Sequence, residues 1–368
     1  MIASPPPPKR GPSPGAPGSR RWRFGALVLV TLTASACSSF GYGVQAVAGG
    51  LDVLARRQPI SRVLARPGLA ASERAGLELA VELRKFSVRE LALPDNGSYR
   101  SYVRLGREYV TWNVVAAPAL SVAPVTWCFP VAGCVSYRGY FRERSARRFA
   151  AERARAGEDV AVTGAVAYST LGWFDDPVLD TFLGGEPWSV AALLFHELAH
   201  QVAYAPDDTA FNESFATAVE ELGVERWLAT REGAEGDAER AAYERARDEE
   251  AVARGLLLAA RAELAAIYSS GAPDAEKLAG KRAALERLAA AIDDGRLGAG
   301  YGPWRGREWN NADLAAVADY ALWVPALRRL FEANGGFPAF HAAARELARL
   351  APAERRRRLE ELAPDDPH

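Results

Sequence analysis

The distribution of apolar and polar residues predicts a chain that is helical over most of its length, with a β-rich part before its middle. Apolar residues recur every three or four positions in residues 41–57 and 71–91, which is typical of helices packed on one face. The following segments are rich in β-branched and aromatic residues or alternate in polarity, and we expect them to form a small sheet: residues 108–116, 121–129 and 158–168.

The most apolar helix is expected at residues 188–202, where Pro187 suits the first helical position and Pro206 prevents continuation. A helix that is apolar on nearly every side must be buried. The next helix is expected at residues 209–228, with an aspartate of the preceding turn as its N-cap. Because the connection is short, the second helix should return against the first.

The rest of the sequence favours further helices. They are expected at residues 237–269, 275–293, 311–334 and 337–350. The first two are rich in Ala, Arg, Glu and Leu, which suits an antiparallel pair. A glycine-rich link at residues 295–306 separates them from the last two. The fold class is therefore expected to be α+β and predominantly α-helical. We expect a single domain, residues 37–368, in which residues 231–368 form a helical C-terminal subdomain.

Two of the four histidines bracket a glutamate within the apolar helix: His196, Glu197 and His200. Positions i and i+4 share one face of a helix, so both imidazoles can bind one zinc ion, and Glu197 can act as a base beside it. Unpaired polar groups on a buried helix cost about 1–3 kcal/mol each, and a metal supplies the partner. The alternative is a pair of core histidines bonded to backbone, but chance produces such a motif in only about one chain in a few hundred.

A hydrolytic zinc site needs three protein ligands and one open position. Residues 212–216, Asn-Glu-Ser-Phe-Ala, resemble the segment that carries the glutamate ligand in the gluzincins, the zinc peptidases that include thermolysin and the large aminopeptidases. The resemblance implies Glu213 as the third ligand. Those families usually place the glutamate further along the chain, so Glu220 is the alternative ligand or a supporting group. His341 and His368 are expected to have ordinary packing or surface roles.

The composition argues against nucleic acid as a partner. The 368 residues include 45 Lys and Arg against 46 Asp and Glu, the formal net charge is −1, and no basic stripe is interleaved with aromatic residues. The arginine run at residues 355–358 is followed closely by Glu360 and Glu361, which favours a solvated helix end.

The N-terminus has the features of an export signal. Residues 1–36 combine a basic head with an apolar stretch that is shorter than the 17–25 residues or so of a membrane-spanning helix, so we expect a signal peptide. Residues 34–39, Ala-Ser-Ala-Cys-Ser-Ser, resemble the bacterial lipobox, which implies lipidation of Cys37 and anchoring to a lipid bilayer of the cell envelope. Ser38 favours the outer membrane, on its periplasmic side. The alternative is ordinary signal cleavage and a soluble secreted protein.

The other two cysteines agree with export. Cys128 and Cys134 are close in sequence and lie in a segment that contains Pro and Gly. In an oxidising compartment such a pair is expected to form a disulfide that closes a small loop.

Several longer segments extend the resemblance to a family of bacterial aminopeptidases, many of them lipoproteins: residues 128–134, 137–141, 167–177, 196–216 and 310–312. Membership implies a zincin-like fold, one zinc ion per chain and a peptide substrate. Within these motifs, Tyr168, Tyr140 and Arg138 are candidate donors to the oxyanion of the reaction. Asp175 and Asp176 are candidate anchors for the free ammonium group of a peptide.

Two other functions remain open at this point. An endopeptidase would use the same zinc chemistry and would differ only in how it recognises the substrate. A lipoprotein that keeps the fold as a non-catalytic scaffold would have no need of a base at Glu197, so the intact glutamate argues against it.

Overall fold

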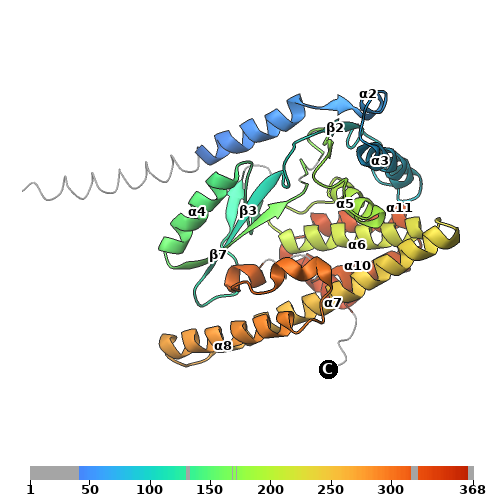
Figure 1. Cartoon of the computed structure of the whole chain (residues 1–368). Helices are drawn as coiled ribbons and strands as arrows, with labels where there is room; N and C mark the ends of the chain where they lie inside the picture. Colours follow the sequence, from blue (N-terminus) through green and yellow to red (C-terminus); the bar gives the residue numbers. More distant parts are fainter. Residues whose placement is uncertain (1–40, 130–132, 168, 171, 316–321, 364–368) are drawn as a thin grey trace, which may run out of the picture. The chain divides into compact units, whose positions relative to one another are not determined.

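The computed structural model describes residues 41–129, 133–167, 169–170, 172–315 and 322–363 (Figure 1). Two compact units are distinguished, Met1–Ala48 and Gly49–His368, and the described part of the first is helical. Three residues of interest lie outside the described part: Cys37, Tyr168 and His368. Among the described residues, no helix has both the length and the apolar character that a membrane crossing requires.

The first part of the larger unit combines two helices with a three-stranded sheet. Helix α2 (Ile60–Leu64) is followed by α3 (Ala71–Arg89), which confirms the second helix expected from the sequence. The strands β1 (Gln58–Pro59), β2 (Ser101–Val103) and β8 (Val178–Leu179) lie in the order β1-β2-β8. The pairing of β2 with β8 is parallel and joins the segment after α3 to the segment that leads into the central helices.

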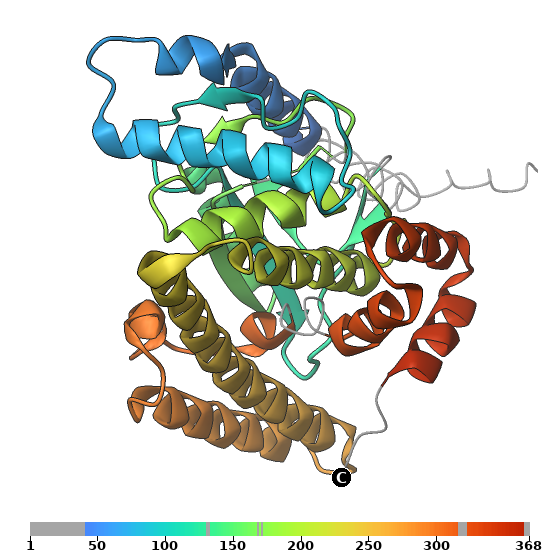
Figure 2. The ribbon, with the colours of Figure 1, turned by 90° about the vertical axis from the view of Figure 1, so that its right-hand side faces the viewer.

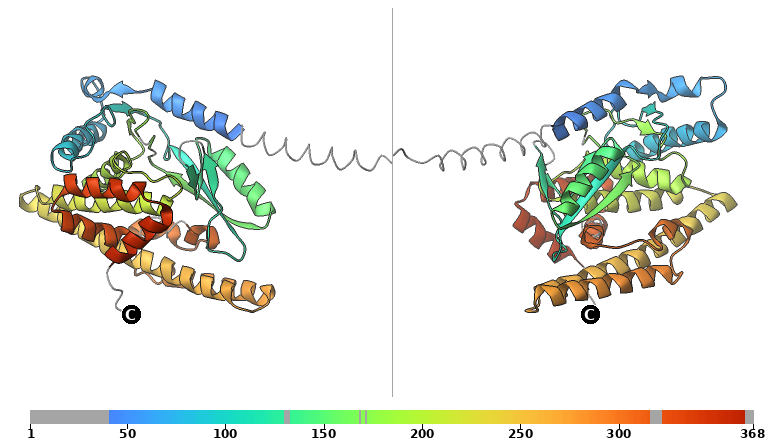
Figure 3. Two further views of the ribbon diagram at one scale, coloured as in Figure 1. Left: turned by 180° about the vertical axis from the view of Figure 1, so that it is seen from behind. Right: turned by 60° about the vertical axis from the view of Figure 1, so that its left-hand side comes forward.

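A second sheet has the order β6-β3-β7 and is antiparallel throughout. Strand β3 (Thr111–Pro118) pairs along its whole length with β7 (Glu158–Ala165), and β6 (Arg138–Tyr140) forms the other edge. Helix α4 (Glu143–Arg155) packs along this sheet, as Figure 3 shows. The sequence therefore placed β3 and β7 correctly to within a few residues.

The third pair of strands is a hairpin that the sequence predicted only in part. Within the expected strand 121–129, only β4 (Trp127–Phe129) is extended, and it pairs with β5 (Gly133–Val135). Pro124 lacks the N–H that a ladder needs, so the segment before β4 stays irregular. Cys128 and Cys134 face each other in this hairpin and form a disulfide, as expected. The described strands thus form three small sheets instead of one.

Two helices form the centre of the larger unit, α5 (Pro187–Ala199) and α6 (Thr209–Leu228). Pro187 begins α5, and the carboxylate of Asp208 accepts a hydrogen bond from the N–H of Phe211, so it is the N-cap of α6. A Cβ at Gly223 of α6 would lie 2.8 Å from the ring of Phe195 on α5. Only glycine therefore allows the two helices to approach this closely.

The hairpin of α7 (Gly233–Ser269) and α8 (Asp274–Asp293) confirms the expected antiparallel pair (Figure 2). It has a hydrophobic cluster of its own, formed mainly by Ala253, Leu257, Ala260, Leu264, Ala284, Leu288 and Ile292. A short 3-10 helix, η1 (Ala299–Trp304), lies in the glycine-rich link.

The helix expected at residues 311–334 is not continuous. Residues 311–315 are helical, residues 322 and 323 form a turn, and α10 begins only at Val324 and runs to Asn334. Pro325 explains this start, because proline lacks an N–H and favours the first turn of a helix. Two further helices follow, α11 (Phe337–Arg349) and α12 (Pro352–Leu362).

One arginine of the run in α12 is buried, whereas the sequence predicted that the whole run is solvated. Arg355 is only 2% exposed, and its Nε donates to Asp208 at 2.7 Å. Its guanidinium also lies over the ring of Phe211, 5.3 Å from the centroid. The three following arginines are exposed. Helix α12 is therefore tied to the start of α6, within the same hydrophobic core as α5.

Candidate metal centre

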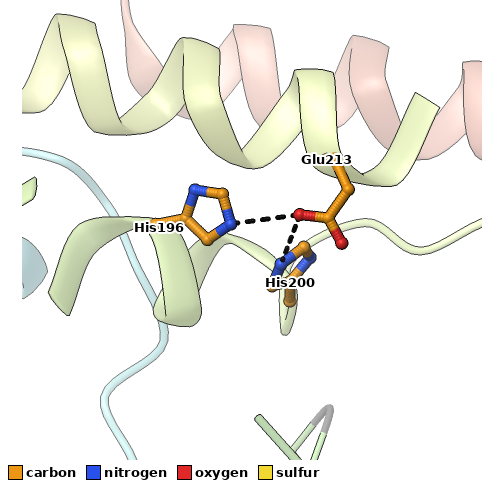
Figure 4. Close-up of side chains that lie close together, drawn as sticks. All are labelled: His196, His200 and Glu213. Carbon is orange, nitrogen blue, oxygen red and sulfur yellow. Dashed lines mark hydrogen bonds and ion pairs between the residues drawn. The ribbon is translucent and has the colours of Figure 1, made fainter. Parts of the chain in front are cut away.

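The candidate metal centre lies between helices α5 and α6. His196 is in the last turn of α5, and His200 is the C-cap of this helix. His200 keeps right-handed helical angles and its N–H donates to the carbonyl of His196, so the two imidazoles stay on one face. Glu213, near the start of α6, points toward both imidazoles from the facing helix (Figure 4).

The three side chains converge on one point. Oε2 of Glu213 lies 3.3 Å from Nε2 of His196 and 3.7 Å from Nε2 of His200. One ligand atom from each residue lies within 4.8 Å of the other two. Ligand atoms bound at about 2.0–2.1 Å to a tetrahedral zinc ion are separated by about 3.3 Å. Two imidazole nitrogens and one carboxylate oxygen at these spacings fit such an ion, with a fourth position for water.

The pKa values of the three ligands differ with what each faces. Burial lowers the pKa of His196, but hydrogen bonds to Glu213 and Glu220 outweigh it, and the pKa is raised well above its usual value. For His200, burial dominates and lowers the pKa to about 4. Burial opposes ionisation of Glu213, yet the charges of the two histidines lower its pKa. The carboxylate and the His200 imidazole thus have the forms that bind a metal at neutral pH.

Glu220 occupies a different position from Glu213. Its Oε2 lies 3.0 Å from Nδ1 of His196, on the side of the imidazole away from the cluster. An ionised carboxylate only accepts hydrogen bonds, so Nδ1 carries the proton and the lone pair of Nε2 is directed at the cluster when the ring is neutral. The geometry therefore favours Glu213 as the ligand and Glu220 as the group that orients His196.

Glu197 lies half-buried beside the two histidines and has no hydrogen-bond partner among the described residues. Burial is the largest cause that raises its pKa to about 7. The charges of Glu213, Asp176 and Glu220 act in the same direction, and His196 opposes them. A carboxyl group with a pKa near neutrality can both accept and return a proton.

The two aspartates predicted as amine anchors lie in different environments. Asp176 is 1% exposed, and its Oδ2 accepts a hydrogen bond from the N–H of Thr170 at 2.9 Å. Burial raises its pKa to about 6. Asp175 is exposed and lines an open cavity of about 360 Å³ together with Arg57 and Arg100. Only Asp175 is therefore directly accessible to a ligand.

The candidate oxyanion donors are placed as follows. Arg138 and Tyr140 are buried on β6, and the guanidinium of Arg138 stacks over the ring of Phe149 at 4.6 Å from the centroid. Their role as donors remains a prediction.

His341 is a buried core residue, in agreement with its expected packing role. Its ring contacts the aromatic rings of α11 and α6. Burial lowers its pKa to about 4, so it is neutral in the folded protein at pH 7.

Two residues between His200 and Glu213 had no role predicted from the sequence. The side-chain amide of Asn212 accepts from the N–H of Ala205 at 2.7 Å and donates to its carbonyl at 2.8 Å, which fixes the loop between α5 and α6. Tyr204 precedes this point and is half-buried. Its pKa is raised by burial and by the charges of Glu213 and Asp207, so its hydroxyl stays protonated and able to donate. The spacing of Tyr204 four residues after His200 was the one signal available.

Comparison with known proteins identifies one family whose model matches this chain. The model of a family described as putative aminopeptidase matches residues 41–359. No curated protein and no solved structure matches the chain.

Proposed function

The chain belongs to the family that this model describes, and we propose that it is a zinc-dependent aminopeptidase. The observation that supports the zinc dependence best is the convergence of His196, His200 and Glu213, whose ligand atoms lie within 4.8 Å of one another. Three ligands of N, N and O type leave one position for water, which is the arrangement of catalytic rather than structural zinc sites. The proposed content is one zinc ion per chain.

In the proposed mechanism, zinc supplies Lewis-acid activation of a water molecule and of the scissile carbonyl. Glu197 accepts the proton of the attacking water and passes it to the leaving amine. Glu220 holds the His196 ring in the tautomer that presents Nε2. Tyr204 is a further candidate donor to the developing oxyanion, because it lies in the connection between His200 and Glu213.

Selectivity for a chain end requires an anion that binds the substrate's ammonium group. We assign this role to Asp175, whose exposed carboxylate is carried by the segment after Gly172. Gly172 itself lies against Gln201, the residue next to His200, so this segment borders the metal centre. The buried carboxylate of Asp176 stabilises the same segment by accepting a hydrogen bond from the N–H of Thr170. Asp175→Asn should raise KM for free-amine peptides and leave the zinc content unchanged.

The experiment that tests the proposal combines metal analysis with peptide hydrolysis. The purified wild-type protein is expected to contain one zinc ion per chain and to cleave peptides with a free amine but not N-blocked ones. Glu197→Gln should keep the metal and lose about 10²–10⁴-fold in kcat. The matched control is Glu186→Gln, an exposed glutamate at the start of α5, which should behave as wild type.

Other outcomes lead to other functions. Cleavage of blocked peptides would establish an endopeptidase in place of an aminopeptidase. Stoichiometric zinc without cleavage of either class would favour the scaffold, and absence of zinc would contradict the assignment of His196 and His200.

We also propose that the mature protein begins at Cys37 and is lipid-anchored on the periplasmic side of the outer membrane. Residues 34–39, which resemble the lipobox, support this. Mass spectrometry of the N-terminal peptide from the native membrane fraction should find a lipid-modified Cys37, and Cys37→Ala should release the protein from the membrane. An unmodified N-terminus would indicate ordinary signal cleavage.

A further inference from the structure

Two large aromatic residues are exposed on the segment that packs against Gln201, the residue after His200. Trp173 is 69% exposed and Phe174 is 53% exposed. Isolated apolar residues on a surface are common and need no explanation. These two are consecutive and belong to the segment that borders the candidate site, so their exposure calls for a functional account.

The segment that carries the pair is held in place by several hydrogen bonds. The N–H of Trp173 donates to the carbonyl of Thr170 at 3.0 Å, and the N–H of Phe174 donates to Oγ1 of the same threonine at 3.1 Å. That hydroxyl donates in turn to the carbonyl of Phe174. The buried carboxylate of Asp176 accepts from the N–H of Thr170 at 2.9 Å. The two aromatic rings are therefore presented by a fixed backbone, and little conformational entropy is lost when a ligand contacts them.

The same segment lies against the end of α5. Gly172 has a φ of +79°, and a Cβ there would lie 3.5 Å from Cγ of Gln201. Gln201 is fixed from its other side, since its Oε1 accepts from Asn96 at 2.7 Å and its Nε2 donates to Ser98 at 3.2 Å. Gln201 follows His200 directly, so the aromatic pair belongs to a segment packed against the residue next to a metal ligand.

We propose that Trp173 and Phe174 form an apolar subsite that selects peptides with a large apolar side chain next to the bond that is cleaved. The proposal rests on the proposed peptidase function. A flat aromatic surface gains most from burial against another apolar side chain.

The test compares substrates and binding in the zinc-loaded full chain. Wild type should prefer phenylalanyl and leucyl amides over the alanyl amide by at least about tenfold in kcat/KM. Trp173→Ala and Phe174→Ala should each remove most of this preference while changing kcat/KM for the alanyl amide by less than about threefold. Trp173→Phe should restore it, because an aromatic surface is kept. The matched control is Leu278→Ala on α8, an apolar residue with 37% exposure, which should leave the preference intact.

A binding measurement separates this subsite from the peptidase proposal. Calorimetry with phenylalanine hydroxamate and alanine hydroxamate needs zinc but no turnover. A ratio of affinities of at least about ten in wild type, falling to near one in Trp173→Ala, would support the subsite even if no peptide amide were cleaved. An equal affinity for both hydroxamates in wild type, or a ratio unchanged in both alanine variants, would overturn it, as would a preference for lysyl over phenylalanyl amides. Loss of binding to anionic lipid vesicles in Trp173→Ala, with the substrate preference unchanged, would instead assign the pair to a membrane surface.

Discussion

Glu220 of α6 lies 3.0 Å from Nδ1 of His196 on α5, while Nε2 of the same ring faces Glu213. The two carboxylates are two helical turns apart, and one imidazole joins them. The ring is thereby held at both nitrogens, which determines its orientation.

Removing Glu220 should therefore weaken metal binding without removing a ligand. We expect Glu220→Ala to lower the affinity for zinc by about 10–100-fold, because the ring of His196 loses the acceptor that orients it. Competition with a chromophoric chelator measures this directly. Glu225→Gln serves as the control, since Glu225 is on the same helix and pairs with Arg328 instead. An unchanged affinity in Glu220→Ala would show that the orientation of His196 is fixed by packing alone.

The second prediction concerns Asn212 and the loop between the metal ligands. Asn212→Ala leaves the N–H of Ala205 without its partner, and it removes one of the two hydrogen bonds to the carbonyl of Ala205, which also accepts from the N–H of Asp208 at 3.3 Å. An unsatisfied buried group costs about 1–3 kcal/mol, so the free energy of unfolding should fall by about that amount in urea titrations. Zinc affinity should fall as well, because the loop positions His200 relative to Glu213.

Asn334→Ala is the matched control for this variant. Asn334 donates to a carbonyl of its own helix near the C-terminal end of α10. Its loss should change stability by less than about 1 kcal/mol. An equal effect of both substitutions would contradict a special role for Asn212.

The third prediction concerns Arg355, which joins α12 to the cap of α6. Arg355→Leu leaves Asp208 without its cationic partner and removes the contact with Phe211. Breaking a buried pair on one side costs about 3 kcal/mol, and the free energy of unfolding should fall accordingly. Arg356→Leu, at an exposed position of the same helix, should stay within about 0.5 kcal/mol of wild type. If the two variants unfold at the same denaturant concentration, the buried pair contributes nothing.

The fourth prediction concerns stability at acid pH. The pKa of His341 is lowered by burial from its usual value near 6.5 to about 4, so the folded protein favours the neutral ring. Above pH 6.5 the ring is neutral in both the folded and the unfolded state, and the fold keeps its full stability. As the pH falls from about 6.5 to about 4, the unfolded chain binds a proton that the folded protein does not, so the free energy of unfolding decreases. The full loss is about 3 kcal/mol.

The measurement for His341 is a comparison of wild type with His341→Leu across this pH range. Leucine does not titrate, so the variant should lose stability less steeply than wild type between pH 6.5 and 4, with similar slopes above pH 7. Parallel curves throughout would mean that His341 is already protonated in the fold or remains accessible to water.

The pattern of residues along the chain determined the elements of the candidate site. The apolar run with Pro187 at its start gave α5 to within three residues, and the end points of α6 agree with the expected range. The i, i+4 spacing of His196 and His200 is a local property of a helix, so it survives in the structure unchanged. The pairing of Cys128 with Cys134 was equally local.

The tertiary structure decided which distant groups meet these residues. Sequence spacing left Glu213 and Glu220 as alternatives, and the packing of α6 on α5 put one at the ligand cluster and the other behind His196. The tertiary structure also buries Asp176 and leaves its neighbour Asp175 exposed. Such outcomes depend on which side of each element faces the core.

Arg355 illustrates the same limit. A run of arginines near glutamates is typical of a solvated helix. Arg355 is nevertheless buried, because it donates a hydrogen bond to Asp208 and packs over the ring of Phe211. Local sequence determines whether a segment is helical and where its own neighbours lie. The partners of a buried charge come from elements far along the chain, and only the packed fold brings them together.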